Sequence, residues 1–213
     1  PVWVQKEMDM RSQFLVVVGA TCVLFVASSV HAALVPGVTA STNMLWTNST
    51  SVTNIVNGSG LPGNTPSLSG VHTWPNASNV WASGYKTGYV VFDMMGSVLL
   101  DGISVWAFNG DATIGARDIQ LLVSTDGVAY TPIVGAPTLL AQGPWANQVA
   151  PQVFGFAPVT ATHVRLDILT NYGHPSSSGF AEIQFSGTPV PEPMTITLLS
   201  LGGIALLRRK RSA

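Results

Sequence analysis

The sequence predicts an all-β fold, and three observations point to this class. Apolar residues alternate with a period of two in the segments 103–108, 119–123 and 163–168, and this period places one face of a strand against a core. Glycine, proline, asparagine and serine separate these segments. No apolar pattern of helical period runs long enough to build a helix bundle. We therefore expect an antiparallel β-sandwich.

Seven segments are expected to form the strands of this sandwich. In chain order they are 89–92, 103–108, 119–123, 130–134, 153–156, 163–168 and 181–185. Asp126-Gly127 stands between the third and the fourth segment, where it favours a hairpin turn with positive φ angles. The exported part, residues 33–190, is long enough for one sizeable core, and a second domain is not expected.

Composition excludes several classes of function. Only 9% of the 213 residues are charged, against roughly 25% in a typical soluble domain. Residues 33–190 carry seven acidic and three basic side chains, so clustered cations that could neutralise a nucleic acid backbone are lacking. The 46% of hydrophobic residues fits a packed core and not a disordered chain.

The N-terminal segment is typical of a secretory signal peptide. Arg11 precedes an apolar run at 14–26, and Val30-His31-Ala32 offers small residues for signal peptidase. Because the run has 13 residues, below the roughly 20 of a spanning helix, we expect cleavage after Ala32 and a start codon downstream of residues 1–9. Cys22, the single cysteine, falls in this segment, so the exported part has no thiol.

The C-terminal segment has three parts in order. Pro191-Glu192-Pro193 is followed by an apolar run at 194–207 and by a basic cluster at 208–211. As a helix, the run would span about 21 Å, which is short for a permanent transmembrane anchor. The arrangement resembles the PEP-CTERM sorting signal of Gram-negative bacteria. This resemblance implies transient membrane insertion, processing by an exosortase, and a role in exopolysaccharide or biofilm; an ordinary tail anchor is the alternative.

The segment between these ends, residues 33–188, resembles the F5/8 type C (discoidin) family. The boundaries expected from the sequence are thus 1–32 for the upstream residues and signal, 33–188 for the sandwich and 189–213 for the sorting signal. The resemblance implies a galactose-binding-like jelly roll. The segments that carry it are 57–60, 79–83, 89–93, 103–106, 124–127, 164–166 and 171–183.

The family also implies a metal site. Its members often hold a structural calcium ion between the first loop and the last strand, and the corresponding residues here are Asn57 and Glu182. Calcium takes six to eight oxygen ligands, and Asn57 replaces the aspartate that is usual in the family. The alternative for Glu182 is a carboxylate that accepts hydrogen bonds from loop amides.

Sugar recognition in this family uses the loops at one end of the sandwich. An aromatic ring there stacks on the sugar, and polar side chains bind its hydroxyl groups. Trp106 is also suited to core filling, and Arg165 to bracing a carboxylate such as Asp101. The candidate ligand residues are His72, Trp74, Trp106, Asn109, Arg165, Asn171, Tyr172 and His174.

The sequence thus predicts an exported, non-catalytic carbohydrate-binding protein of the cell envelope or extracellular matrix. It contains no Gly-x-Ser-x-Gly elbow and no His-Glu-x-x-His motif. Two alternatives stay open: a structural matrix protein without a ligand, and a hydrolase or lyase that acts on polysaccharide. The second alternative requires two carboxylates in one cleft.

Overall fold

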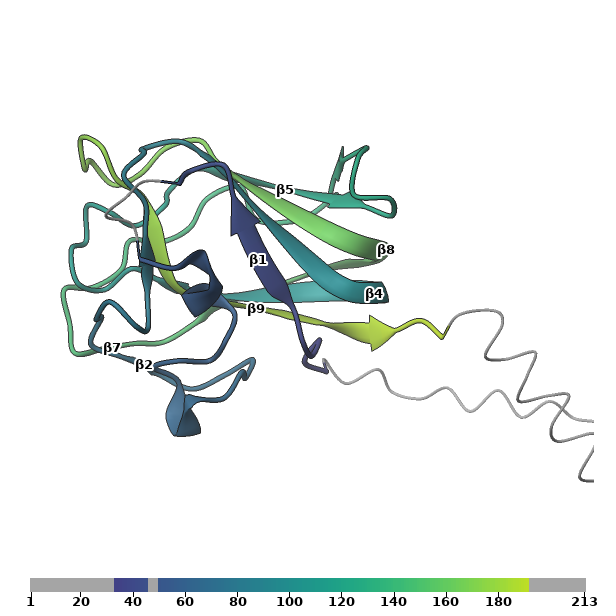
Figure 1. The fold of residues 1–213 in the computed structure, drawn as a ribbon, viewed down its shortest axis with the longest axis horizontal. Coiled ribbons are helices and arrows are strands. Elements are labelled where there is room, and N and C mark those ends of the chain that lie inside the picture. Colours follow the sequence, from purple (N-terminus) through teal and green to yellow (C-terminus); the bar gives the residue numbers. More distant parts are fainter. Residues whose placement is uncertain (1–32, 46–49, 192–213) are drawn as a thin grey trace, which may run out of the picture. The chain divides into compact units, whose positions relative to one another are not determined.

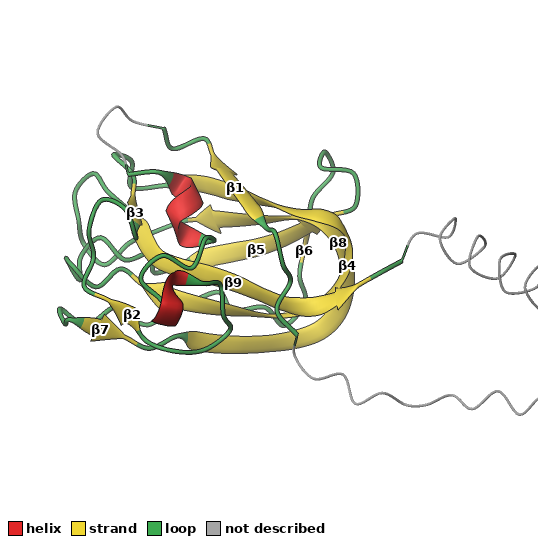
Figure 2. Ribbon diagram, turned by 60° about the horizontal axis from the view of Figure 1, so that its bottom comes forward, coloured by secondary structure: helices red, strands yellow, loops and turns green. Residues whose placement is uncertain are grey.

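The computed structural model describes residues 33–45 and 50–191, and strands make up most of the regular structure in these ranges (Figure 1). Two short 3-10 helices, η1 (Val52–Ile55) and η2 (Pro62–Asn64), lie outside the strands (Figure 2). The expected all-β sandwich is therefore confirmed. The strands are β1 (Thr39–Thr42), β2 (His72–Thr73), β3 (Trp81–Ala82), β4 (Gly88–Ala107), β5 (Ile119–Ser124), β6 (Thr131–Pro132), β7 (Gln148–Val149), β8 (Gln152–Ile168) and β9 (Gly179–Pro189).

Two long antiparallel strands, β4 and β8, run through both layers of the sandwich. Residues 88–93 of β4 pair with β1 on one side and with residues 163–168 of β8 on the other. Residues 98–107 of β4 pair instead with β9 and with residues 152–161 of β8. We call the first layer, completed by β5 and β6, the front sheet, and the second, completed by β9 and β3, the back sheet.

The strand β4 bends between the two sheets at residues 94–97. Asp93 pairs with His163, but Val98 pairs with Ala161, so four residues of β4 stand opposite a single residue of β8. Met95 has a φ of 56° in this segment, an uncommon conformation for a residue other than glycine. The sequence therefore separates 89–92 from 103–108, which are two halves of one strand, because the alternation is lost at the bend.

The loop between β5 and β6 contains the expected Asp-Gly turn. Gly127 has a φ of 74°, as its sequence context predicts. The carboxylate of Asp126 accepts hydrogen bonds from the N–H groups of Val128 and Ala129 at 2.8 and 2.9 Å. The fourth predicted strand, 130–134, is reduced to the two residues of β6.

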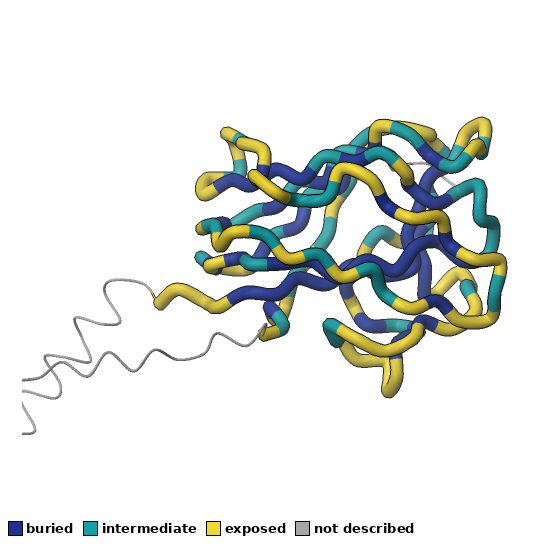
Figure 3. The backbone as a smooth tube through the Cα atoms, turned by 180° about the vertical axis from the view of Figure 1, so that it is seen from behind, coloured by how far each residue is buried: buried dark blue, intermediate teal, exposed yellow. Residues whose placement is uncertain are grey.

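The main core lies between the front and back sheets, where buried strand segments cross the centre of the molecule (Figure 3). The rings of Phe92 and Phe185 meet edge to face at 4.9 Å, and Trp81 stacks on Phe180 at 6.4 Å. Each such pair joins two different strands, and burial of each large side chain contributes roughly 1.5–3 kcal/mol.

The outer faces of the two sheets differ. The loop from 57 to 80 covers the back sheet: the indole N–H of Trp106 donates to the carbonyl of Gly70 at 3.0 Å, and the Ser104 hydroxyl donates to that of Leu68 at 2.9 Å. Trp106 is fully buried in a second apolar cluster beneath this loop. The front sheet, in contrast, keeps the outward side chains of Tyr89 and Asp93 partly exposed.

The first residues of the described segment 33–45 and the last residues of 50–191 lie together at one end of the sandwich (Figure 1). The N–H of Gly187 donates to the carbonyl of Ala33, and that of Val190 donates to Ser97 in the β4 bend. The strands β2 and β7 lie toward the opposite end (Figure 1). The expected signal peptide and the C-terminal run lie outside the described residues, as do Glu192 and Pro193. Among the described residues, no helix has the length and hydropathy to cross a membrane.

Replacement of Trp106 by phenylalanine tests whether the 57–80 loop is packed on the back sheet. The variant loses a buried hydrogen bond and part of a large ring, so we expect the free energy of unfolding to fall by about 2 kcal/mol. The matched control is Trp145→Phe, because Trp145 is 70% exposed, and its change should stay within about 0.5 kcal/mol. Urea unfolding measures both; equal effects would contradict the packing.

Candidate functional site

Four loop segments meet at the end of the sandwich that lies away from Ala33 and Val190. They are 72–79, 108–115, 140–147 and 171–178, and we call this region the loop end. The side-chain amide of Asn109 joins two of them, because its Nδ2 donates to the carbonyls of Thr73 at 3.2 Å and Ala146 at 3.1 Å. Next to these carbonyls in the chain are Trp74, 42% exposed, and Trp145, 70% exposed. One amide thus holds together two loops that each present a tryptophan.

Asn109 is fully buried, and its Oδ1 has no hydrogen-bond partner in the described structure. A buried carbonyl oxygen without a donor costs about 1–3 kcal/mol. Because this oxygen is buried, Asn109 fixes the two loops from the interior and does not itself contact a ligand at the surface.

The 171–178 loop is fixed by its own side chains. Asn171 Nδ2 donates to the carbonyls of His174 and Ser177 at 2.9 and 2.6 Å, so this buried side chain shapes the loop. His174 Nδ1 accepts the N–H of Ser177 at 2.9 Å. The hydroxyl of Tyr172 donates to the carbonyl of Leu140. Tyr172 and His174 remain partly exposed on a loop whose shape is set.

Four of the eight predicted ligand residues are buried: Asn109 and Asn171, described above, and two more in the interior. His72 is fully buried, with its Nε2 2.9 Å from the carbonyl oxygens of both Ser59 and Asn79. Trp106 is buried under the 57–80 loop, which is the core-filling alternative considered from the sequence. Neither side chain reaches the surface, so of the eight candidates the structure exposes Trp74, Tyr172 and His174 at the loop end.

Glu182, one of the two predicted metal ligands, is fully buried in β9. Its Oε1 accepts hydrogen bonds from the N–H of Gly58 at 3.1 Å and from the side chain of Gln184, as the hydrogen-bonding alternative anticipates. Its Oε2 is also buried but has no partner in the described structure. Burial raises the pKa of Glu182 to about 8, against the opposing effect of these two hydrogen bonds.

Asn57, the other predicted metal ligand, lies on the surface. Its Oδ1 accepts the N–H of Ser59 at 2.8 Å, and the side chain is exposed. Within the described ranges, no group of three or more His, Cys, Asp or Glu side chains is arranged to hold a metal ion. In the described part of the chain, the buried side-chain oxygens without a partner are the Oε2 of Glu182 and the Oδ1 of Asn109.

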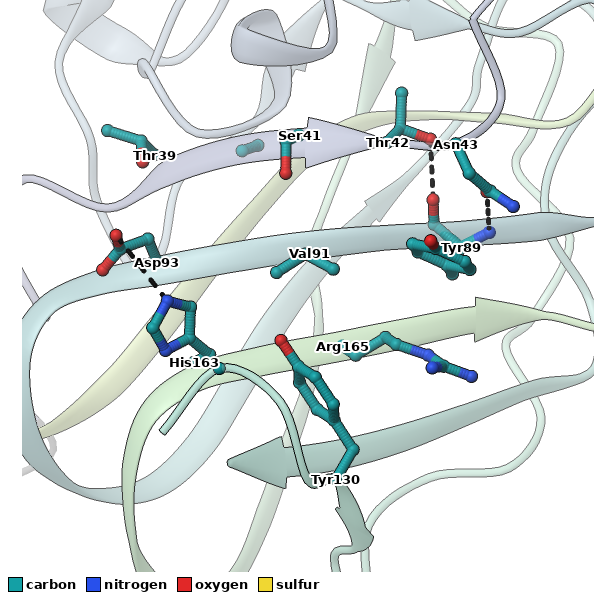
Figure 4. Close-up of a pocket in the computed structure, with 12 residues that line it drawn as sticks. Thr39, Ser41, Thr42, Asn43, Tyr89, Val91, Asp93, Tyr130, His163 and Arg165 are labelled. Atoms are coloured by element: carbon teal, nitrogen blue, oxygen red, sulfur yellow. Dashed lines mark hydrogen bonds and ion pairs between the residues drawn. The ribbon is translucent and has the colours of Figure 1, made fainter. Parts of the chain in front are cut away.

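A hollow of about 540 Å³ lies on the open outer face of the front sheet. We call it the front groove, and Figure 4 shows the side chains that line it. Three strands and the β5–β6 loop contribute to it. Its lining residues are Thr39, Ala40, Ser41, Thr42, Asn43, Tyr89, Val91, Asp93, Gly127, Tyr130, His163 and Arg165.

Arg165, the one ligand candidate that lines the front groove, is held from two sides. Its guanidinium donates to both carboxylate oxygens of Asp167, at 2.6 and 2.9 Å, so it does not brace Asp101 as the sequence suggested. It also lies over the rings of Tyr89 and Tyr130, at 4.7 and 5.7 Å from their centres. Hydrogen bonds with Asp167 raise the pKa of Arg165 above its usual value.

Asp93 and His163 form the other end of the front groove. They are direct partners across β4 and β8, and the His163 Nε2 lies 3.8 Å from the Asp93 Oδ2. The Asp93 Oδ1 accepts the N–H of Met95 at 2.8 Å, and the His163 Nδ1 lies 2.9 Å from the Thr162 hydroxyl. Both side chains are thus oriented and partly exposed.

Sequence reasoning missed Trp145, Tyr89, Asp93 and Tyr130 as candidate site residues. Trp145 stands in a segment without strand periodicity, and a lone tryptophan there gave no indication of its neighbours. Tyr89 and Asp93 stand at alternate positions to the buried residues of a predicted strand, so the sequence did indicate that they point outward. Only the register shows which residues of other strands stand beside them.

Solved structures that are similar to this chain include carbohydrate-binding modules. No protein-family model matches it, and no curated protein sequence is significantly similar. A Clostridium perfringens module, CpGH89CBM32-5 in complex with GalNAc-β-1,3-galactose, is 17% identical with a TM-score of 0.47 and covers 72% of this chain and 99% of its own. The family 32 carbohydrate-binding module of Streptococcus pneumoniae EndoD is 17% identical, with a TM-score of 0.48 and coverages of 72% and 98%.

A third similar structure is the family 32 module of C. perfringens NanJ in complex with galactose. It is 11% identical, with a TM-score of 0.47, and covers 73% of this chain and 99% of its own. At these identities and scores the modules do not identify what this chain binds.

The buried carboxyl group of Glu182 predicts that the protein loses stability as the pH rises. The pKa of Glu182 is about 8 in the folded state and near the ordinary glutamate value of 4.5 in the unfolded state, so only the folded state retains the proton between these pH values. The contribution of this proton to the free energy of unfolding is fully present below pH 4.5. It falls by up to roughly 1.4 kcal/mol per pH unit until pH 8. Chemical unfolding at several pH values should show that Glu182→Gln removes this slope.

Asp126→Asn is the matched control for this series. Hydrogen bonds from loop N–H groups lower the pKa of Asp126 to about 2. The contribution of Asp126 to the free energy of unfolding is therefore lost only as the pH falls below the ordinary pKa of an aspartate. The control should leave the slope between pH 4.5 and 8 unchanged. An identical slope in wild type and Glu182→Gln would show that the carboxyl group is not held in its neutral form.

Proposed function

We propose that this protein is an exported, non-catalytic β-sandwich that binds carbohydrate at its loop end. The observation that carries the proposal is the Asn109 amide, which ties together the loops bearing Trp74 and Trp145. Indole rings offer flat apolar faces with a polar edge, which suits a partly hydrated site. The same loop end supplies Tyr172 and His174 on a loop that Asn171 holds in place.

The charges of the described residues favour a neutral ligand. Lys86, Arg117 and Arg165 are the only lysine and arginine residues in the described part of the chain, and Arg165 is neutralised by Asp167. A phosphorylated or strongly acidic polymer needs clustered cations, whereas a neutral saccharide needs aromatic surface, amides and hydroxyl groups. The side chains at the loop end are of the second kind.

The position of the chain ends suits display on a surface. Ala33 and Val190 lie by the β4 bend, while Trp74 and Trp145 lie at the other end of the sandwich. A C-terminal sorting signal of the PEP-CTERM type, recognised by an exosortase after signal peptidase has acted, would leave the loop end pointing away from its attachment. Many displayed copies would then add avidity to a weak single site, which favours polysaccharide of the cell envelope or matrix as the ligand.

Binding is favoured over hydrolysis by the position of the carboxylates. Glycoside hydrolases act with two carboxyl groups that face one bond. Asp111 is the one carboxylate in the four segments of the loop end, and its Oδ1 accepts two hydrogen bonds from Thr113. Asp93 is the one carboxylate among the residues that line the front groove. A structural matrix protein without a ligand remains the competing proposal, and the binding experiment below separates the two.

A structural calcium ion is a second part of the proposal, supported by the buried, unpartnered Oε2 of Glu182. A hard cation is the kind of partner that a desolvated carboxylate oxygen accepts. Glu182 would supply the charged ligand, and backbone carbonyls of the loop that starts at Asn57 would supply others. The ion would tie this loop to β9 and would hold the Glu182 carboxyl group in its ionised form.

Removal of the exposed tryptophans should weaken glycan binding. We expect Trp74→Ala and Trp145→Ala each to raise the dissociation constant by roughly three- to tenfold, because an aromatic contact contributes about 0.5–1.5 kcal/mol. Affinity electrophoresis against polysaccharide gels and calorimetry with galactose or GalNAc-β-1,3-galactose measure this change. Val134→Ala, which truncates a side chain that is 87% exposed, is the control and should have no effect.

Two outcomes would decide against the loop end. Binding that survives both tryptophan substitutions unchanged would place the ligand elsewhere on the protein. Wild-type protein that binds no glycan in an array or a polysaccharide pull-down would favour the structural matrix protein.

Added calcium should stabilise the protein more at pH 8 than at pH 5. The ion competes with the proton for Glu182, and a ligand of the native state raises the unfolding midpoint by mass action. Thermal unfolding with 1 mM-scale calcium or with a chelator measures the difference, with Glu182→Gln as the variant that should lose it. Equal midpoints with calcium and with the chelator at pH 8 would remove the metal from the proposal.

A further inference from the structure

We propose that the front groove is a second saccharide-binding site, separate from the loop end and selective for neutral, hydroxyl-rich chains. Its volume of about 540 Å³ falls within the roughly 300–1,000 Å³ of small-molecule sites. It shares no lining residue with the loop end. The site extends the proposed function and is tested independently of it.

The register of the front sheet explains why these side chains come together. Ser41 of β1 stands opposite Val91 of β4, which stands opposite Arg165 of β8. One row further along, Thr39, Asp93 and His163 are aligned in the same way. Side chains in such rows point to the same face of the sheet.

β1 is short and lies at the edge of the front sheet, where its side chains form one wall of the groove. Thr39 and Ser41 are exposed, so their hydroxyl groups are available to a ligand. Asn43, at the end of β1, accepts the N–H of Tyr89 at 2.8 Å through its Oδ1. Because this bond uses only the oxygen of the Asn43 amide, its N–H groups remain to donate to a ligand.

Tyr89, Arg165 and Tyr130 form the other wall and part of the floor. The guanidinium of Arg165 lies over both rings, and the bidentate pair with Asp167 holds it there. Figure 4 shows the Tyr130 hydroxyl directed toward Val91. A sugar has apolar C–H patches and hydroxyl groups, and this wall offers aromatic surface and a hydroxyl in a fixed arrangement.

Arg165 also determines the charge that the groove accepts. Its two N–H groups toward Asp167 are occupied, and its positive charge is balanced by that carboxylate. Asp93, at the other end of the lining, presents a carboxylate whose side chain is 45% exposed. An acidic saccharide would meet this carboxylate without an unpaired arginine or lysine among the lining residues, so the groove selects against it.

The β4 bend orients the Asp93 carboxylate. The N–H of Met95, a residue with a φ of 56°, donates to Asp93 Oδ1, and Oδ2 faces the His163 Nε2 at 3.8 Å. That gap is wider than a hydrogen bond. A sugar hydroxyl placed between them can donate to the carboxylate and, when the Nε2 carries a proton, accept from the imidazole. Uncommon backbone conformations of this kind often occur at ligand sites.

The groove is tested in the full chain that carries Trp74→Ala and Trp145→Ala, so that binding at the loop end is already reduced. The probes are the neutral trisaccharides galactotriose, maltotriose and cellotriose, with trigalacturonate as the acidic counterpart. We expect at least one neutral trisaccharide to bind and trigalacturonate to bind more weakly. Tyr130→Ala and Asp93→Asn should each weaken that binding by roughly fivefold.

Tyr85→Ala and Asp101→Asn are the matched controls, because both residues lie outside the groove lining, and they should leave the dissociation constant unchanged. Thermal midpoints within a few degrees of the parent show that each variant is folded. Three outcomes would overturn the site: no binding of any neutral trisaccharide, tighter binding of trigalacturonate, or unchanged binding in both groove variants. Glycan binding that is equal in the wild type and in the double tryptophan variant, but is weakened by the groove variants, would overturn the proposed function alone.

Discussion

The pairing of β4 with β8 is the constraint on which the rest of the structure depends. The two strands run together through both sheets, and each half of β4 has a different second neighbour, β1 in front and β9 behind. The bend at 94–97 is what allows one strand pair to serve two layers. The same bend fixes the Asp93 carboxylate through the N–H of Met95. A single backbone feature thus sets the sandwich and one end of the front groove.

The two outer faces of the sandwich differ because only one of them is covered. The 57–80 loop lies over the back sheet and makes buried hydrogen bonds to Ser104 and Trp106, so this face adds a second apolar cluster to the core. The front sheet keeps its outward residues accessible, and the groove forms there. The interior end of the 57–80 loop also meets Glu182 through Gly58, which links the covering loop to β9 and to the proposed calcium ion.

Both proposed sites use side chains that are fixed before any ligand arrives. The amide N–H groups of Asn109 donate to two loop carbonyls. The guanidinium of Arg165 donates to Asp167 and lies over two tyrosine rings. Fixed groups lose little freedom on binding, which matters for shallow sites because the cost of ordering is a large part of the total free energy. The sandwich therefore acts as a rigid frame for two surfaces of similar chemistry.

The sequence alone determined the all-β class, the inward residues of the strands and the low charge that disfavours polyanions, because period-two alternation and composition are local properties of the chain. It did not determine that 89–92 and 103–108 belong to one strand, since the joining residues at the bend do not alternate. Nor could it decide between the two roles considered for Trp106, sugar stacking and core filling, because only packing of the 57–80 loop buries this ring. The tertiary structure alone decided which side chains meet, because Ser41, Asp93 and His163 become neighbours through strand register, which links residues that are distant in the chain.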